Sequence, residues 1–198
     1  MDQVVPRLTS RTAHVCVDMQ RLFSHDGPWS TPWLLKVVPQ CVALARYRPE
    51  ATITRFVTPV SADGRGSLEG VLSPLARTTR ARIDPALLEL VPELASFVPP
   101  ALVFDKPVYS AFAGRKLVAH QQHRDVDTVI PDGSRDRHLR AMLGAGRGRS
   151  WTPCLIATDA VCSFSDAGHD ALLDLFKQRF CQQIFTAETA RILEEWRE

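Results

Sequence analysis

The sequence has no apolar run long enough to span a membrane, and its first residues, MDQVVPRLTSRT, lack the apolar core of a secretion signal. No two of its five cysteines have the CxxC spacing that is typical of a zinc site. An odd, scattered set of cysteines in a chain of this size indicates free thiols rather than a disulfide framework. These features predict a cytoplasmic protein with no membrane partner.

The sequence also lacks internal repeats and any sign of a second domain. Its 198 residues suit one domain, and an apolar fraction of 45% is ordinary for a globular protein with a buried core. We therefore expect a single domain over residues 1–198. The formal net charge of +2 is too small to point to any class of partner.

Strands and helices alternate along the chain. Short apolar or β-branched runs predict strands at 13–18, 51–57, 101–104, 126–130, 155–158 and 183–185. Helical spacing of apolar residues predicts helices at 34–47, 85–97, 111–123, 166–180 and 187–196. Ser165 is a candidate cap for the helix that follows it. This alternation predicts a mainly parallel sheet that helices cover on both faces.

Two charged side chains stand where predicted strands end, namely Asp18 and Lys106. Ligands of open α/β sheets bind beyond the carboxyl ends of the strands, so both residues are candidates for chemistry. The lysine would keep the aspartate charged, and such a pair can activate a thiol: the carboxylate takes the thiol proton and the cation stabilises the thiolate. The alternatives are an ordinary ion pair, or a helix cap in the case of Asp18.

Three motifs resemble a known family. VDMQRLF at 17–23, DKPVYSAF at 105–112 and ATDAVCSFSDAGHDALL at 157–173 are similar, in order and spacing, to the isochorismatase-like cysteine hydrolases. This superfamily includes nicotinamidases, N-carbamoylsarcosine amidases and isochorismatases. The resemblance implies a three-layer α/β/α sandwich with a mostly parallel six-stranded sheet, assembled as a homodimer or homotetramer. It also implies an Asp-Lys-Cys catalytic triad, in which Asp18 and Lys106 match the first two members.

The third member of the triad does not match. The position that corresponds to the family's cysteine is occupied by Leu139. Cys162 belongs to a later motif, and Cys154 belongs to a different strand. The surrounding stretch 131–154 is unusual, since it holds five arginines and four of the ten glycines. As written, the chain has no nucleophile at the expected place.

A compensated frameshift would explain this stretch. Read one nucleotide later with freely chosen synonymous codons, Ser134–Arg140 can give R-E-T-D-I-C-V, which places a cysteine at position 139. In the same way Arg149–Leu155 can give D-L-G-H-R-V, and Leu68–Ala76 can give W-[R/K]-x-Y-Y-x-x-W, both of which resemble family segments at those places. We hypothesise that residues of about 64–78 and 131–154 are frameshifted.

Three other interpretations of residues 131–154 stay open. The stretch could be a flexible basic loop that contacts nucleic acid, although it carries little aromatic interleaving. GAGRG at 144–148 could be a phosphate loop, although it does not directly follow a strand. The stretch could also be a genuine divergence in an inactive protein of the same fold, one that binds a small molecule or a partner.

The resemblance implies a mechanism for the complete triad. Asp18 would act as general base toward a thiol at position 139, and Lys106 would lower the pKa of that thiol. The thiolate would attack the carbonyl of a small amide, ureide or carbamoyl compound. The aromatic residues expected to line the pocket, or else to be plain core or rim residues, are Phe23, Trp29, Tyr109 and Phe112.

No cofactor is expected. Nicotinamidases commonly bind zinc through an Asp-x-His pair and a further histidine, whereas Asp18 is followed by HDG at 25–27. We expect His120, His123 and His169 to be solvated or capping residues. The sequence therefore predicts no metal, no nucleic-acid partner, and a small-molecule substrate.

Overall fold

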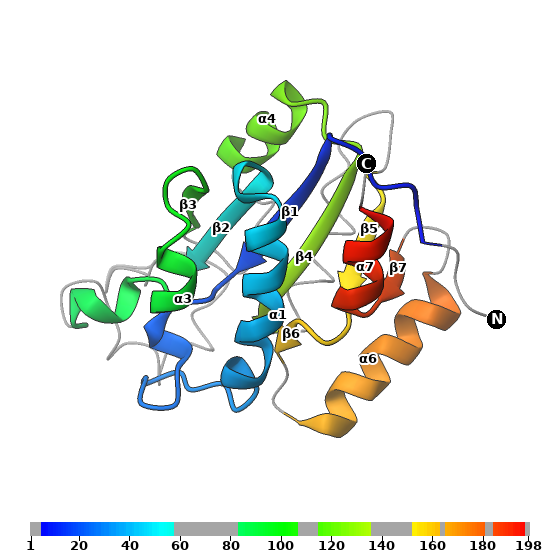
Figure 1. Cartoon of the computed structure of the whole chain (residues 1–198). Helices are drawn as coiled ribbons and strands as arrows, with labels where there is room; N and C mark the ends of the chain where they lie inside the picture. Colours follow the sequence, from blue (N-terminus) through cyan, green and yellow to red (C-terminus); the bar gives the residue numbers. More distant parts are fainter. Residues whose placement is uncertain are drawn as a thin grey trace.

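The protein, described here by a computed structural model, is built on one parallel sheet (Figure 1); the structure describes residues 5–57, 83–106, 115–135, 152–162, 165–180 and 184–196. The strand order is β3-β2-β1-β4-β5-β7, and β6 pairs with β4, every pairing being parallel. The strands are β1 (Thr12–Val17), β2 (Thr52–Val57), β3 (Leu102–Lys106), β4 (Thr128–Arg135), β5 (Cys154–Ala157), β6 (Val161–Cys162) and β7 (Ile184–Ala187). Six of the seven strands match predicted ones, and the two-residue β6 is the addition.

Helices cover both faces of the sheet. On one face, Val15 of β1 packs with Leu117 of α4 (Arg115–His123), and Ile156 of β5 packs with Phe176 of α6 (Asp166–Arg179). Because side chains alternate between the two faces of a strand, the intervening residues of β1 and β5 point the other way.

The opposite face carries α1 (Leu34–Tyr47) and α7 (Thr189–Glu195), which lie side by side across the sheet (Figure 1). Here Cys16 of β1 and Leu155 of β5 share a buried cluster with Leu44 of α1 and Ile192 of α7. Both faces are thus apolar and covered. The predicted three-layer α/β/α sandwich is confirmed.

One predicted helix is divided in two. In place of a helix over 85–97, the structure has a short 3-10 helix, η4 (Pro85–Leu88), and a one-turn helix, α3 (Pro92–Ala95), with extended backbone at Glu89 and Val91 between them. Proline has no N–H to donate and its ring clashes with the preceding turn, so it is favoured in the first turn of a helix, where Pro92 stands in α3.

Strand β4 runs to Arg135 instead of ending at the predicted Ile130. Proline, aspartate and glycine at 131–133 are poor strand formers, so the sequence gives no strand signal there. Pairing decides the outcome, because this segment lies in register with β1 from Thr12↔Thr128 to Val17↔Gly133. The carboxyl end of β4 consequently lies at the same edge of the sheet as the end of β1.

Other predictions from local sequence patterns are confirmed. Helix α1 has the predicted bounds, and Ser165 caps α6 by accepting a hydrogen bond from the Gly168 N–H at 3.1 Å. The short helices η1 (Arg21–Phe23) and η2 (Pro49–Ala51) follow β1 and α1. Among the described residues, no helix is both long and apolar enough to cross a bilayer.

Candidate active site

Asp18 and Lys106 meet at the carboxyl edge of the sheet. The Lys106 Nζ donates a hydrogen bond to Asp18 Oδ2 at 2.9 Å and lies 2.9 Å from Oδ1 as well. Asp18 follows β1 and Lys106 ends β3, so the lysine reaches across the end of β2, which lies between those two strands. Both side chains are buried, with exposures of 3% and 0%. Burying two opposite charges together is tolerable because each compensates the other.

The backbone turns sharply at Asp18. Its φ of 58° lies in the left-handed region, which few residues other than glycine, asparagine and aspartate adopt. The turn takes the chain out of the sheet immediately after Val17. The carboxylate is therefore held at the strand end and does not continue the alternation of β1.

The neighbouring strand contributes a glycine that this turn requires. Gly133 of β4 has a φ of +80°, and a Cβ at this position would lie 2.7 Å from the Val17 carbonyl oxygen and 2.6 Å from Met19 Cγ. Backbone and side chain on both sides of Asp18 thus approach Gly133 closely. Any larger residue there would have to displace the segment that holds the carboxylate.

A buried glutamine holds the segment that follows Asp18 in place through hydrogen bonds. The Gln20 side-chain amide donates to the Leu88 carbonyl oxygen at 2.8 Å, and Gln20 and Leu90 form an antiparallel bridge. The Val91 N–H donates to the Met19 carbonyl oxygen at 3.0 Å. Sequence reasoning quoted Gln20 as part of a motif but assigned it no role. The structure identifies it as a positioning residue for the loop after Asp18.

The predicted pocket residues are only partly described. Phe23 lies in η1 and is 5% exposed within the core, and its ring centroid is 5.9 Å from that of Trp29. Trp29 is partly buried against the same core. Tyr109, Phe112 and Leu139 lie outside the described residues. The assignment of these residues to a substrate pocket or a nucleophile position stays a prediction.

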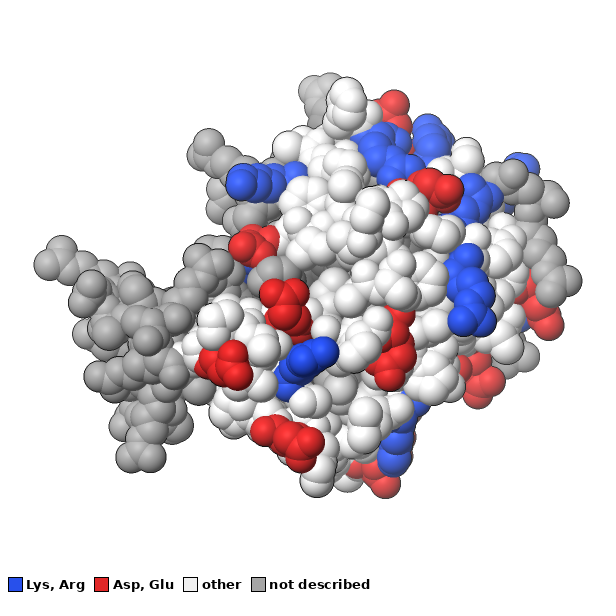
Figure 2. Space-filling view, turned by 60° about the vertical axis from the view of Figure 1, so that its left-hand side comes forward, with Lys and Arg blue, Asp and Glu red and all other residues white. Residues whose placement is uncertain are grey.

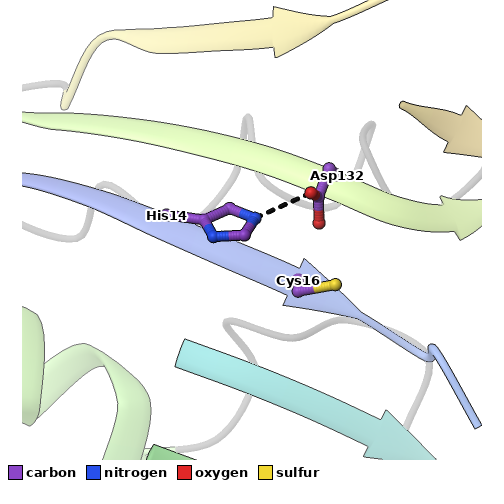
Figure 3. A group of neighbouring side chains, drawn as sticks. All are labelled: His14, Cys16 and Asp132. Atoms are coloured by element: carbon purple, nitrogen blue, oxygen red, sulfur yellow. Dashed lines mark hydrogen bonds and ion pairs between the residues drawn. The ribbon is translucent and has the colours of Figure 1, made fainter. Parts of the chain in front are cut away.

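A second polar group lies within the sheet, on the face that α1 covers. His14 Nε2 and Asp132 Oδ2 are 2.7 Å apart, and both side chains are fully buried. Cys16 is next to them, and the ligand atoms of His14, Cys16 and Asp132 all lie within 4.8 Å of one another (Figure 3). This is the group of described residues that could hold a metal ion. The sequence-based search for metal ligands considered the histidines at 120, 123 and 169 and missed it.

Those three histidines differ in their surroundings. His169 is buried, at 7% exposure, and its ring centroid lies 4.6 Å from that of Trp33. It packs in the interior, so the expectation that it is solvated is wrong. His120 packs against Phe104, with ring centroids 5.5 Å apart. Partial burial lowers the pKa of His120, with smaller contributions from the positive charges of Arg124 and His123. His123 is exposed, as predicted.

A comparison with models of protein families assigns the chain to a family. A model of the isochorismatase domain matches residues 12–133, which include both Asp18 and Lys106. The chain belongs to the isochorismatase domain family. This agrees with the resemblance carried by the three sequence motifs. No curated protein matches the chain in sequence.

Solved structures share the isochorismatase-family fold at low sequence identity. A cysteine hydrolase from Pseudomonas syringae pv. phaseolicola has a TM-score of 0.83 at 20% identity, covering 99% of this chain and 97% of that one. An N-carbamoylsarcosine amidase from Thermoplasma acidophilum has a TM-score of 0.66 at 20% identity, with 90% and 96% covered. A pyrazinamidase/nicotinamidase from Streptococcus mutans has a TM-score of 0.64 at 19% identity, with 89% and 99% covered.

Proposed function

We propose that this protein is a cysteine hydrolase that cleaves a C–N bond in a small amide, ureide or carbamoyl compound. The observation that carries the proposal is the buried Lys106–Asp18 pair at the carboxyl edge of the sheet, where α/β proteins bind their ligands. The family assignment and the amidases among its structural relatives support it. The proposal also includes the frameshift hypothesis, because position 139 reads leucine.

The proposed nucleophile position suits this pair. Position 139 follows the last residue of β4 closely, and β4 is the parallel neighbour of β1. The chain therefore leaves β4 at the edge where Asp18 and Lys106 meet. A thiol at this edge would lie near both a proton acceptor and a cation.

The reaction would proceed in two steps. Asp18 would take the thiol proton, the thiolate would add to the carbonyl carbon, and the Lys106 ammonium would stabilise the thiolate. Asp18 would then return the proton to the departing nitrogen, leaving an acyl-thioester and a free amine or ammonia. Water, deprotonated by Asp18, would attack the thioester and release the acid and the thiol. Phe23, Trp29, Tyr109 and Phe112 are the proposed pocket residues.

The alternative is an inactive family member that binds a small molecule or a partner. Leu139 favours it, because a leucine side chain cannot act as a nucleophile. Nucleic acid is a poor candidate for that partner on the face drawn in Figure 2, where acidic and basic side chains of the described residues are intermixed rather than gathered by sign. The homodimer or homotetramer and the cytoplasmic location stay predictions of the sequence.

Peptide mass mapping of the purified protein over residues 116–170, combined with a thiol-reactive probe at neutral pH, tests the proposal. Cysteines 16, 41, 154 and 162 are buried and should stay unlabelled in the folded protein. Fast labelling at position 139, lost in Lys106→Met, is the expected result. Cys181 lies outside the described residues, so Cys181→Ser is the control that keeps labelling specific to position 139.

Two outcomes would contradict the proposal. Peptides that read SRDRHLR at 134–140 would exclude the nucleophile and favour the inactive protein. A cysteine present at position 139 but no more reactive than a free thiol, with no ammonia or amine released from a panel of small amides, ureides and carbamoyl compounds, would exclude the hydrolase.

A further inference from the structure

Three potential metal ligands converge between the sheet and α1, and the thiol of Cys41 lies beside them. His14 and Cys16 are two apart on β1, so they share one face of the sheet, and Asp132 of β4 lies beside Cys16 in the parallel register. Cys41 of α1 lies close enough to Cys16 for their thiol groups to interact. All four residues are 0–1% exposed. Between them they offer two sulfurs, an imidazole nitrogen and a carboxylate.

One of these ligand atoms has no partner. Asp132 Oδ2 bonds to His14, but Asp132 Oδ1 is buried without any hydrogen bond. Figure 3 shows this second oxygen directed toward the sulfur of Cys16, whereas the imidazole of His14 faces the first oxygen. A buried carboxylate oxygen without a donor is unfavourable. A cation among these side chains would compensate it.

Burial disfavours the ionised form of both thiols. Burial raises the pKa of the Cys16 thiol well above its ordinary value, helped by its hydrogen bond to Cys41 and by the negative charge of Asp132. Burial raises the pKa of Cys41 to about 12, and its own thiol donates to the Ala160 carbonyl oxygen at 3.7 Å. A bound divalent cation favours the thiolate over the protonated thiol, because coordination releases the thiol proton to solvent.

We propose that His14, Cys16 and Asp132 bind a zinc ion in the interior of the protein, with the Cys41 thiol beside it. Zinc takes its ligands from cysteine, histidine and carboxylate, and these three residues supply one of each. With the Cys16 thiolate, the Asp132 carboxylate and neutral His14 as ligands, and Cys41 as a neutral thiol, the site carries no net charge, which suits full burial.

This site is separate from the candidate active site. Its ligands lie on the α1 face inside the sheet, whereas Asp18 and Lys106 lie at the carboxyl edge. Zinc would tie β1 and β4 together and would take no part in the chemistry. The two proposals can therefore fail independently of each other, with one exception. Asp132 falls within residues 131–154, so a frameshift that begins before residue 132 would remove a metal ligand.

Cobalt and zinc reconstitution of the full chain tests the proposal. Since the site is buried, the protein is unfolded with reductant and chelator, then refolded with Zn²⁺ or Co²⁺ and desalted. We expect about one metal ion per chain to be retained. The cobalt form should show sulfur-to-cobalt charge-transfer absorption and the intense visible bands of a tetrahedral ion, and zinc should raise the thermal midpoint.

Matched cysteine variants locate the site. Cys16→Ala should lose the charge-transfer absorption and weaken binding by more than the ~10–100-fold that follows loss of a residue that only supports a ligand. Cys154→Ala is the control, because this cysteine is also buried, at 9% exposure, but belongs to a different cluster on β5. Asp132→Asn, which preserves size, should weaken binding without removing the sulfur absorption.

Three results would overturn the proposal. Wild-type protein that refolds but retains no metal would show that His14 and Asp132 are a buried hydrogen-bonded pair and nothing more. Cobalt bands that persist in Cys16→Ala, or that vanish equally in Cys154→Ala, would place the metal elsewhere. Peptide masses without an aspartate at position 132 would remove the site. If Cys16→Ala does not fold, the wild-type spectrum and Asp132→Asn still decide.

Discussion

Lys106 Nζ lies 2.9 Å from both carboxylate oxygens of Asp18, although 88 positions separate the two residues in the sequence. Neither side chain is more than 3% exposed. In such a place the loss of one partner leaves an uncompensated buried charge, whereas the loss of both leaves none. Stability and activity should therefore respond differently to the single and the double replacement.

We expect Asp18→Asn and Lys106→Met each to lower the free energy of unfolding by about 3–5 kcal/mol, because each replacement removes the opposite charge that compensates the remaining buried one. Asparagine is chosen since it tolerates the left-handed backbone at this position. The double variant should lose much less than the sum. Urea unfolding of the four proteins measures the coupling, and strictly additive losses would show that the two groups do not interact.

Gly133→Ala should destabilise the protein by about 2 kcal/mol or more, because the left-handed backbone penalises any Cβ by about 1–2 kcal/mol and the new atom would also collide with Val17 and Met19. Chemical denaturation measures the loss. Gly168→Ala is the comparison, since Gly168 lies in helix α6, where alanine is favoured. Equal effects at the two glycines would contradict the close approach described for Gly133.

Ser165→Ala should lower the free energy of unfolding by about 1 kcal/mol, because the first turn of α6 loses the acceptor for the Gly168 N–H. Ser165→Asp should retain most of the stability, since aspartate is an equally good cap. Ser96→Ala is the control: Ser96 Oγ donates to the Glu93 carbonyl on the exposed surface, where such changes stay within about 0.5 kcal/mol. Thermal unfolding compares the three variants.

Stability should fall at alkaline pH partly because of buried thiols. Burial raises the pKa of Cys154 from 9.0 to about 12, so the unfolded chain loses this proton at lower pH than the folded one. The stabilisation is complete below pH 9.0 and is lost as the pH rises from there toward about 12, with a limiting slope of about 1.4 kcal/mol per pH unit.

Cys154→Ala checks this effect. Its free energy of unfolding, measured by urea denaturation with a chelator present, should fall less steeply with pH than that of the wild type between pH 9.0 and about 12. Other groups that titrate in this range are common to both proteins and cancel in the comparison. Parallel pH profiles would show that the thiol ionises equally well in the folded and unfolded states.

Much of the fold could be read from local pattern. Helix α1 has its predicted bounds because its apolar residues recur at helical spacing, and Ser165 begins α6 because its side chain satisfies a free N–H there. Asp18 and Lys106 were placed at one edge because the carboxyl ends of parallel strands share an edge. These features depend on residues close in sequence or on a general rule of α/β sheets.

Tertiary structure decided the features that depend on strands pairing across the sequence. Pairing with β1 as far as Gly133, and with β6 at Arg135, extended β4 through residues that favour no strand. The register with β1 also set Gly133 against the turn at Asp18. It also placed Asp132 at 2.7 Å from His14, 118 positions earlier. A single sequence carries no local signal for such a meeting, because burial and pairing, not the propensity of either residue, bring the two side chains together.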